Sequence, residues 1–370
     1  MSKSQLIVTS RVTDSQYKSK QFLARLLENK SDSIWLCQLY EYNERQEFFE
    51  LVVNNVLINL GAELDVQLFD FVTIINSRVR VVYSSAFQSN TVFTTVRCNS
   101  NCIMCSQPPL EVDDGNFNVA IWYKINELLV ENGITSLGFS GGEPTILGDD
   151  LISLINAMTN KHSELLIDVL SNGRRLGQSA GRKLLERVKH PSRVRFCIPL
   201  YSGISSRHDY IVQSKTSFWD TVNGLYNCNY FGLKTEIRLV IQKDTIDHLG
   251  FFVEFIKNNL WFVDHFALMG LEQIGYAKSR FEEIDVTNSL RQHKLFQKTL
   301  KTLSREGLNV SIYNLPLCYI PEEVHGYARK SISEWKNSFH SDCEKCSKRS
   351  NCSGFFSWNL NSKTNVHPFT

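Results

Sequence analysis

Short apolar runs and amphipathic stretches alternate regularly from about residue 90 to residue 275. The amphipathic stretch over 118–132 is the clearest, because Val119, Trp122 and Ile125 share one helical face and Gly133 follows as a stop. Strands joined by helices run parallel, so the pattern predicts an α/β fold with a sheet that is open or curved toward a barrel. Sites of such sheets lie beyond the C-terminal ends of the strands. The expected strands are 91–97, 134–140, 165–171, 194–200, 235–241 and 265–270.

The two flanks of this segment have other patterns. Residues 1–88 carry β-rich runs at 34–40 and 78–83, and helical spacing over 15–29. After residue 275 we expect a long helix over 288–306 and a strand over 309–314. The sequence therefore predicts three regions, which are a β-rich N-terminal region over 1–88, the alternating segment over 89–275 and a C-terminal region over 276–370.

The ten cysteines are the most informative part of the composition. No apolar run approaches about 18 residues, and the start, MSKSQLIVTSRV, lacks a signal peptide's apolar core, so we expect a cytoplasmic protein with no membrane partner. A reducing compartment favours metal binding or catalysis for clustered cysteines. The net charge of +2 argues against a nucleic-acid partner. Cys37, Cys197 and Cys228 stand alone among apolar residues, so we expect them in the core.

The first cysteine group, Cys98, Cys102 and Cys105, follows the first expected strand in the tight loop CNSNCIMCSQPP. A short loop of this kind can turn three thiolates toward one centre. Three protein ligands leave one coordination position open, which is typical of a reactive metal site. A structural zinc site would need a fourth ligand, and the next candidate in the sequence is the distant His162.

A glycine-rich turn ends the second expected strand, in the sequence LGFSGGEP over 137–144. Alone it reads as a plain strand-to-helix turn. Together with the CxxxCxxC loop it resembles the radical S-adenosylmethionine (radical SAM) enzymes, over roughly residues 90–275. The resemblance implies a partial (β/α)6 barrel, and a [4Fe–4S] cluster whose fourth iron binds S-adenosylmethionine (SAM). The implied cluster ligands are Cys98, Cys102 and Cys105, and the implied SAM contacts are Gly141, Gly142, Glu143 and Pro144.

Two further strand ends match this family in part. Ser171 and Asn172 close the third expected strand, where relatives carry a Thr/Ser-Asn-Gly turn near SAM, so the resemblance implies SAM contacts there as well. The fourth strand ends with Pro199 and Tyr201, where many relatives have Ser and Asp, so a ribose contact does not transfer to it. His208-Asp209 also recurs in relatives, and the pair fits either a site-shaping role or a helix-entry role.

The second cysteine group, Cys343, Cys346 and Cys352, gains a possible fourth member in Cys318. Four thiols can close a site completely, so it could hold a second iron–sulfur cluster or a structural zinc. The segment resembles the C-terminal extensions called SPASM or twitch domains, which implies an auxiliary cluster.

Several stretches together are similar to one narrower group, the HxsC-type maturases of the His-Xaa-Ser peptide system. This likeness implies a peptide or small-protein substrate and a second radical SAM protein as a partner, and it makes the N-terminal region a candidate docking surface. The stretches are 98–109, 138–145, 314–318, 331–336 and 352–356.

The activity implied by the resemblance is reductive cleavage of SAM to a 5′-deoxyadenosyl radical, which then attacks the substrate. It requires a one-electron donor such as flavodoxin or ferredoxin. Two alternatives stay open at this point. One is a radical SAM enzyme acting on a small molecule or nucleoside, and the other is a non-catalytic zinc or iron–sulfur protein.

Overall fold

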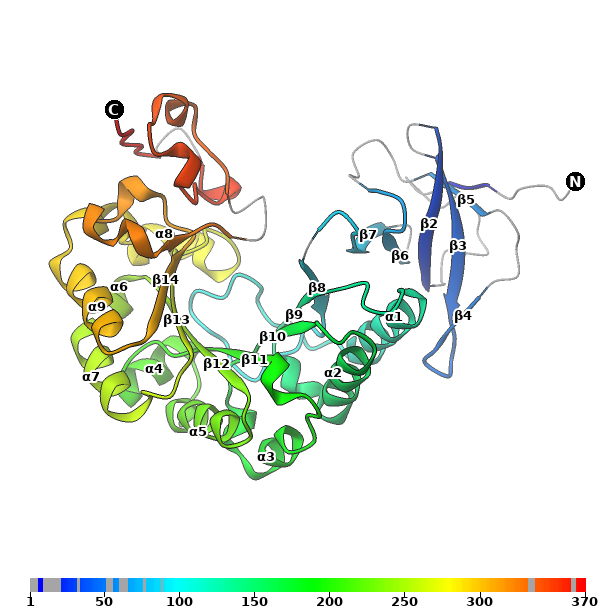
Figure 1. Cartoon of the computed structure of the whole chain (residues 1–370), viewed down its shortest axis with the longest axis horizontal. Coiled ribbons are helices and arrows are strands. Elements are labelled where there is room, and N and C mark those ends of the chain that lie inside the picture. Colours follow the sequence, from blue (N-terminus) through cyan, green and yellow to red (C-terminus); the bar gives the residue numbers. More distant parts are fainter. Residues whose placement is uncertain are drawn as a thin grey trace, which may run out of the picture. The chain divides into compact units, whose positions relative to one another are not determined.

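The computed structural model describes residues 6–8, 21–31, 34–50, 56–59, 66–75, 78–87, 89–331, 337–360 and 364–370. These residues form two sheets (Figure 1), one N-terminal and mainly antiparallel, the other parallel. The HxsC-like stretch over 331–336 lies outside the described residues except for Ser331.

The N-terminal sheet has the strand order β1-β5-β3-β2-β6-β7, and β4 pairs with β3. Only the β1–β5 pair is parallel among the described pairs of this sheet. Its core lies on alternate residues of β2 and β3, where Phe22, Ala24 and Leu26 pack with Cys37 and Leu39. The strands are β1 Leu6–Val8, β2 Gln21–Ser31, β3 Ile34–Tyr42, β4 Phe48–Glu50, β5 Val56–Asn59, β6 Phe71–Ile75 and β7 Arg78–Tyr83.

The predicted helix over 15–29 is wrong for residues 21–29, which lie in β2, and residues 15–20 lie outside the described residues. Phe22, Leu23, Leu26 and Leu27 fit a helical period and a strand period almost equally well. Antiparallel pairing with both β3 and β6 decides between the two. In the paired strand Phe22 and Leu26 lie in the core of one face, Leu23 is also buried, and Leu27 is exposed.

The second sheet is parallel in each of its described strand pairs, and its strands follow one another in sequence order from β8 to β15. One or two helices connect most neighbouring strands, as the alternating sequence pattern predicts. This architecture confirms the expected α/β fold of a partial barrel with a separate β-rich N-terminal region. The strands are β8 Ser89–Phe93, β9 Ser136–Ser140, β10 Leu166–Leu170, β11 Val194–Pro199, β12 Lys234–Val240, β13 His265–Met269, β14 Asn309–Tyr313 and β15 Ala328–Arg329.

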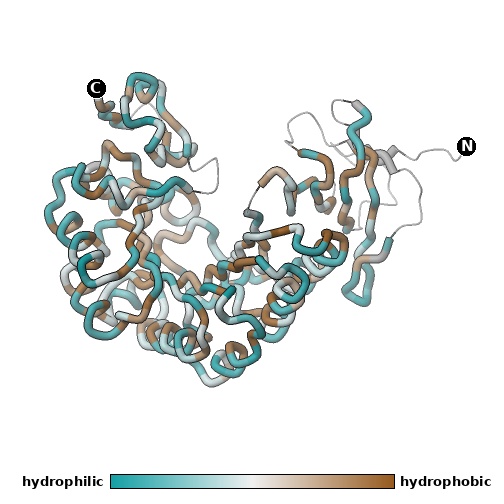
Figure 2. The backbone as a smooth tube through the Cα atoms, viewed as in Figure 1, coloured by the Kyte–Doolittle hydropathy of each residue, from teal (hydrophilic) through white to brown (hydrophobic). Residues whose placement is uncertain are grey.

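Hydrophobic and hydrophilic residues are mixed along the helices (Figure 2), as expected for helices that cover a sheet with one face. Among the described residues, no helix is both long enough and apolar enough to cross a bilayer. The helices are α1 Gly115–Leu128, α2 Asp149–Lys161, α3 Ser179–Leu185, α4 Ser205–Val212, α5 Ser217–Tyr230, α6 Lys243–Ile246, α7 Leu249–Asn259, α8 Tyr276–Ile284 and α9 Lys294–Arg305.

Element boundaries differ from the expected ones at three places. Strand β8 ends at Phe93, so the loop that carries the first cysteines begins earlier than predicted. Helix α1 ends at Leu128, several residues before Gly133. The helix expected over 288–306 is a 3-10 helix, Thr287–Gln292, followed by α9. The strand expected over 309–314 is confirmed as β14, which extends the parallel sheet beyond residue 275.

The chain divides into two compact units. The first comprises Met1–Thr95, Asp113–Ser140 and Asp149–Ile167, and the second comprises Val96–Val112, Gly141–Gly148 and Asp168–Thr370. Both cysteine groups, the glycine-rich turn and the β10 strand end therefore belong to the second unit. The three-region division at residues 88 and 275 stays a prediction.

Candidate functional site

The first cysteine loop is anchored to two helices of the second unit. The amides of Asn101 and Ile103 donate to the carbonyls of Val212 and Ile211 at the end of α4, at 3.1 and 3.0 Å. On the other side, the amide of Tyr276 at the start of α8 donates to the carbonyl of Cys105 at 2.9 Å. Ile103 and Met104 are buried in the core beneath the loop. These contacts fix the loop backbone between its cysteines.

The three thiols of this loop are close neighbours. Burial raises the pKa of Cys98 to about 11 and that of Cys102 to about 12, and the Cys102 thiol also feels the charges of both Cys98 and Cys105. Burial raises the pKa of Cys105 as well. Thiols in this setting need a bound cation to become thiolates.

This donor set fits an iron–sulfur cluster in its chemistry, since three thiols from one short loop face a common neighbourhood. Within the described residues, no three His, Cys, Asp or Glu side chains are grouped so as to hold a single metal ion. That finding concerns one metal ion that is bound by three side chains at once. A [4Fe–4S] cluster binds each thiolate to a different iron atom.

The glycine-rich turn packs directly on the backbone that leads into Cys98. The Glu143 amide donates to the Arg97 carbonyl at 2.8 Å. A Cβ atom on Gly142 would stand 2.1 Å from that same carbonyl oxygen, which is far inside contact distance. Gly141 has a φ of 151°, a conformation that favours glycine. The close approach that Gly142 permits is therefore to the protein's own cysteine loop.

Glu143 joins the glycine-rich turn to the end of β10. Its side chain is fully buried and accepts four hydrogen bonds, from the Thr145 amide and hydroxyl, the Ser171 hydroxyl and the Asn172 amide, at 2.6–3.0 Å. The Asn172 side chain in turn donates to Asn99 Oδ1 at 2.6 Å and lies 3.9 Å from Cys98 Sγ. A contact from Glu143 to SAM stays a prediction, whereas its bonds within the protein already explain a buried carboxylate here.

Tyr201 follows the end of β11, and His208 lies on the next helix, α4. Tyr201 is buried and feels the charges of all three cysteines of the loop. The Tyr201 amide donates to His208 Nδ1 at 3.3 Å, and His208 Nε2 is buried without a hydrogen-bond partner among the described residues. Burial lowers the pKa of His208 to about 3, so the ring is neutral. An unpaired buried nitrogen beside this loop is consistent with a site that takes a polar ligand.

Of the two roles considered for Asp209, shaping the site and helix entry, its contacts match helix entry. Its carboxylate accepts from the amides of Thr216 and Phe218, both at 2.8 Å, and so caps α5.

The second cysteine group and its predicted fourth member, Cys318, line one cavity. Cys318, Cys343, Cys346 and Cys352 all line the same small cavity, together with Phe355 and the segment over 366–369. Cys318, Cys343 and Cys352 are buried, and Cys318 is close enough to feel the charges of the other two. The structure thus brings all four predicted residues together.

Backbone amides point at the sulfur atoms of this second group. Cys352 Sγ accepts from the amides of Leu317 and Gly354, both at 3.3 Å, and Cys346 Sγ accepts from the Phe369 amide at 3.4 Å. Amide-to-sulfur bonds of this kind stabilise metal-bound thiolates and tune cluster potentials. The chemistry of the donor set therefore fits an auxiliary cluster, whose irons each bind a different thiolate, whereas three of these thiols are not grouped here to hold a single zinc ion.

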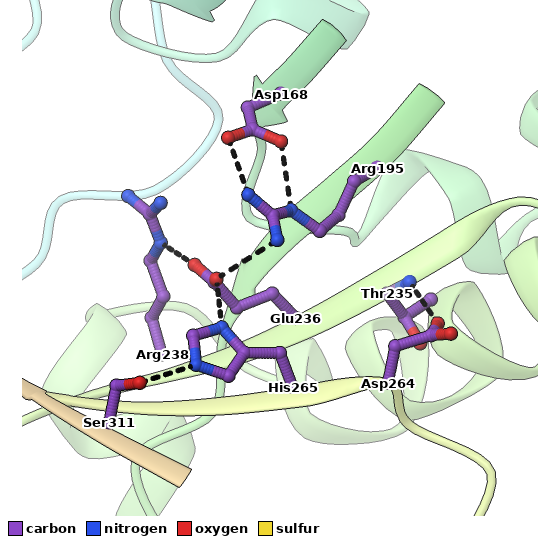
Figure 3. Close-up of polar contacts among 8 residues, drawn as sticks. All are labelled: Asp168, Arg195, Thr235, Glu236, Arg238, Asp264, His265 and Ser311. Carbon is purple, nitrogen blue, oxygen red and sulfur yellow. Dashed lines mark hydrogen bonds and ion pairs between the residues drawn. The ribbon is translucent and has the colours of Figure 1, made fainter. Parts of the chain in front are cut away.

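A polar network that the sequence analysis missed lies in the second unit (Figure 3). His265 contacts Glu236 at 2.5 Å and Ser311 at 3.0 Å, and Arg238 donates to Glu236 at 2.5 Å. Arg195 makes a two-pronged bond to Asp168 at 2.7 and 2.8 Å. Burial acts to raise the pKa of Glu236, but the His265 bond and the two arginine charges together lower it below its ordinary value.

The members of this network come from five consecutive strands, β10 to β14. The sequence signal was a single charged residue within each of the apolar runs LIDVL and VRFCIP, and the pair Glu236 and Arg238 within KTEIRLV. A charged side chain buried in a parallel sheet needs a partner. A charged residue in one of these strands therefore predicts a polar or oppositely charged residue in a neighbouring strand.

A cavity of about 800 Å³ lies in the first unit and includes none of the predicted site residues. Its lining comes from β6, β7, β8 and α1, and includes Arg80, whose guanidinium lies 5.0 Å from the centre of the Phe93 ring.

Comparisons with known proteins agree with this arrangement. A family model described as the Radical SAM superfamily matches residues 92–256. The probable GTP 3′,8-cyclase of Methanocella arvoryzae is 26% identical over 172 residues, which are 45% of this chain and 53% of that protein. The chain thus spans about half the length of this relative.

Two solved structures are similar to this chain at low identity. Native anSMEcpe with bound AdoMet and Cp18Cys peptide has a TM-score of 0.50 and 12% identity, over 76% of this chain and 92% of that one. Streptococcus suis SuiB bound to S-adenosylmethionine has a TM-score of 0.49 and 16% identity, over 70% of this chain and 56% of that one.

Proposed function

We propose, from the match of residues 92–256 to the Radical SAM superfamily model, that the chain is a radical SAM enzyme that cleaves SAM reductively and modifies a peptide or small protein. The observation that carries the first half of the proposal is the hydrogen-bonded assembly of the cysteine loop, the glycine-rich turn and the β10 end. Glu143 and Asn172 link these three segments. The assembly belongs wholly to the second unit.

In this proposal Cys98, Cys102 and Cys105 hold a [4Fe–4S] cluster with one open position. When bound, the cluster supplies the electron that splits the sulfonium of SAM. The chain's own residues position the ligand. The turn over 141–144 and the β10 end with Ser171 and Asn172 line its place, and buried Tyr201 and His208 keep water away from the thiols.

The experiment that tests this activity is anaerobic reconstitution of the full chain, followed by iron and sulfide counting and a SAM-cleavage assay with dithionite. Two [4Fe–4S] clusters predict about eight irons per chain, with release of 5′-deoxyadenosine and methionine. About four irons with one zinc would leave the radical chemistry intact and assign zinc to the second site. Absence of both iron and deoxyadenosine would reject the enzyme and favour a non-catalytic zinc protein.

The peptide substrate rests on the likeness to the HxsC-type maturases, whose system also suggests a second radical SAM protein as a partner. In this proposal the substrate docks on the first unit. Among the described strands, β7 pairs only with β6, so one of its edges is unpaired, and the 800 Å³ cavity adjoins it. An extended peptide could add a strand at that edge.

A second candidate function is suggested by the sequence match to a probable GTP 3′,8-cyclase. In that case the substrate would be a nucleotide. Incubation of the reconstituted chain with SAM, dithionite and GTP distinguishes the two, because a new nucleotide product would replace the peptide proposal.

Replacing Cys346 with alanine tests the second centre. We expect SAM cleavage to continue while product formation on the true substrate falls at least about tenfold, because three thiols cannot close a four-ligand site. The measurements are 5′-deoxyadenosine and modified substrate from the same reaction. Cys37→Ala, in the N-terminal core, is the matched control and should leave the ratio of the two products unchanged. If Cys346→Ala still formed 5′-deoxyadenosine and modified substrate at the normal rate and ratio, the second centre would have only a structural role.

A further inference from the structure

Positive charge is concentrated in one short segment of the second unit. Residues 174–193 contain seven Lys and Arg residues against the single acidic residue Glu186, whereas the whole chain has a net charge of only +2. Four of the seven, Arg182, Lys183, Arg187 and Lys189, are exposed, on α3 and just after it. A segregated field of this kind steers oppositely charged partners.

Helix α5 adds exposed tyrosines beside these charges. The Arg182 guanidinium lies 4.6 Å from the centre of the Tyr230 ring, and Tyr230 is 69% exposed. Tyr226 is 43% exposed and, with Arg182, lines a cavity of about 320 Å³ between α3 and α5. We call the surface formed by Arg182, Lys183, Arg187, Tyr226 and Tyr230 the α3–α5 face. Arginine and tyrosine around a hollow are the residues that dominate protein interfaces.

The turn that leads into α3 touches the first cysteine loop. Arg174 donates to the carbonyl of Asn99 and lies 3.3 Å from the Ser100 hydroxyl, and Asn172 bonds to Asn99 as well. Asn99 directly follows Cys98 and is exposed. The loop thus reaches the surface beside Arg174, at the start of the segment that carries the positive charge.

We propose that the α3–α5 face is the docking surface for an acidic one-electron carrier protein of the flavodoxin or ferredoxin type. This inference rests on the proposed function, since only a reducible centre at Cys98, Cys102 and Cys105 needs such a carrier. In the transfer the carrier loses one electron and the iron–sulfur centre gains it, with no proton or group transferred. The contacts of Arg174 and Asn172 with the cysteine loop favour a redox protein over nucleic acid as the partner.

The test uses the full chain and flavodoxin. Binding is titrated at about 50 mM and about 300 mM salt, since screening over a Debye length should weaken a charge-led contact. The double variant Arg182→Glu/Lys183→Glu should weaken flavodoxin binding by about tenfold and raise the KM for flavodoxin in SAM cleavage to a similar degree. Dithionite-driven cleavage should be unchanged, because a small reductant needs no docking surface.

The matched control is Lys294→Glu/Lys298→Glu on α9, which reverses two exposed charges of the same unit. It should leave binding within about twofold of the unmodified chain. The neutral variant Arg182→Gln/Lys183→Gln should lie between the unmodified chain and the reversal. Equal effects of the α3 and α9 reversals, or flavodoxin binding that is insensitive to the α3 variant, would overturn the proposal.

Two further outcomes separate this inference from the proposed function. If the unmodified chain binds a single-stranded RNA of about 20 nucleotides through the α3–α5 face and not flavodoxin, the face is a nucleic-acid surface and the inference is rejected. If dithionite gives no SAM cleavage at all, the proposed function fails, whereas the binding titration still decides whether the face receives flavodoxin.

Discussion

Replacing Cys102 with alanine is expected to abolish SAM cleavage and to remove about four irons per chain. Cys102 is the middle residue of the loop, and its thiol feels the charges of both other thiols. Two remaining thiolates cannot hold a cluster and leave one iron open for SAM. Iron, sulfide and 5′-deoxyadenosine are measured on the same anaerobic preparation, and alanine at Cys98 or Cys105 should have the same effect.

The matched control for this prediction is Cys228→Ala. Cys228 is fully buried in α5 and belongs to neither cysteine group. Its loss should cost about 1 kcal/mol of core packing and leave iron content and cleavage unchanged. Normal deoxyadenosine formation by Cys102→Ala would show that the cluster is not held by this loop.

Replacing Gly142 with alanine should destabilise the second unit by about 2–3 kcal/mol and lower the iron content of the first centre. The new Cβ would meet the Arg97 carbonyl oxygen at 2.1 Å and its carbon at 2.6 Å. Since both are backbone atoms, the turn and the cysteine loop must move apart. Thermal unfolding of the unreconstituted chain reports the strain, and iron counting after reconstitution reports the displaced loop.

Gly250→Ala provides the control, because nothing lies within 4 Å of the Cβ position of this α7 residue. Alanine there should stabilise the helix by about 0.5–1 kcal/mol and leave iron unchanged. If Gly142→Ala melted like the unmodified chain and loaded with iron normally, the contact with Arg97 would not be needed for the site.

Much of the parallel sheet could be predicted from sequence, because its apolar runs are separated by helices with clear amphipathic faces. Strands β9 to β13 lie within one or two residues of the expected ranges. The N-terminal region resisted prediction for a physical reason. Phe22, Leu23, Leu26 and Leu27 satisfy both periods, and the choice depends on pairing with β3 and β6, which a local pattern does not contain.

The candidate site, too, could be predicted from the sequence only in part. The cysteine spacing identifies the residues that come together, whereas their support depends on contacts between distant segments. Neither the four hydrogen bonds to Glu143 nor the amide bonds to Cys346 and Cys352 follow from a motif. The close contact of Gly142 with the Arg97 carbonyl does not follow from the motif either, and the contact of Gly142 with SAM stays a prediction.

The polar network of the β10–β14 strands also bears on how the chain avoids misfolding. A strand that paired one residue out of register would turn its charged side chain to the opposite face of the sheet. The buried Glu236 would then lose His265 and Arg195, its partners on the neighbouring strands, at a cost of several kcal/mol. Apolar side chains would tolerate such a slip more readily. The network therefore favours one register of the five strands over the competing registers, and it does so whether or not a cofactor is bound.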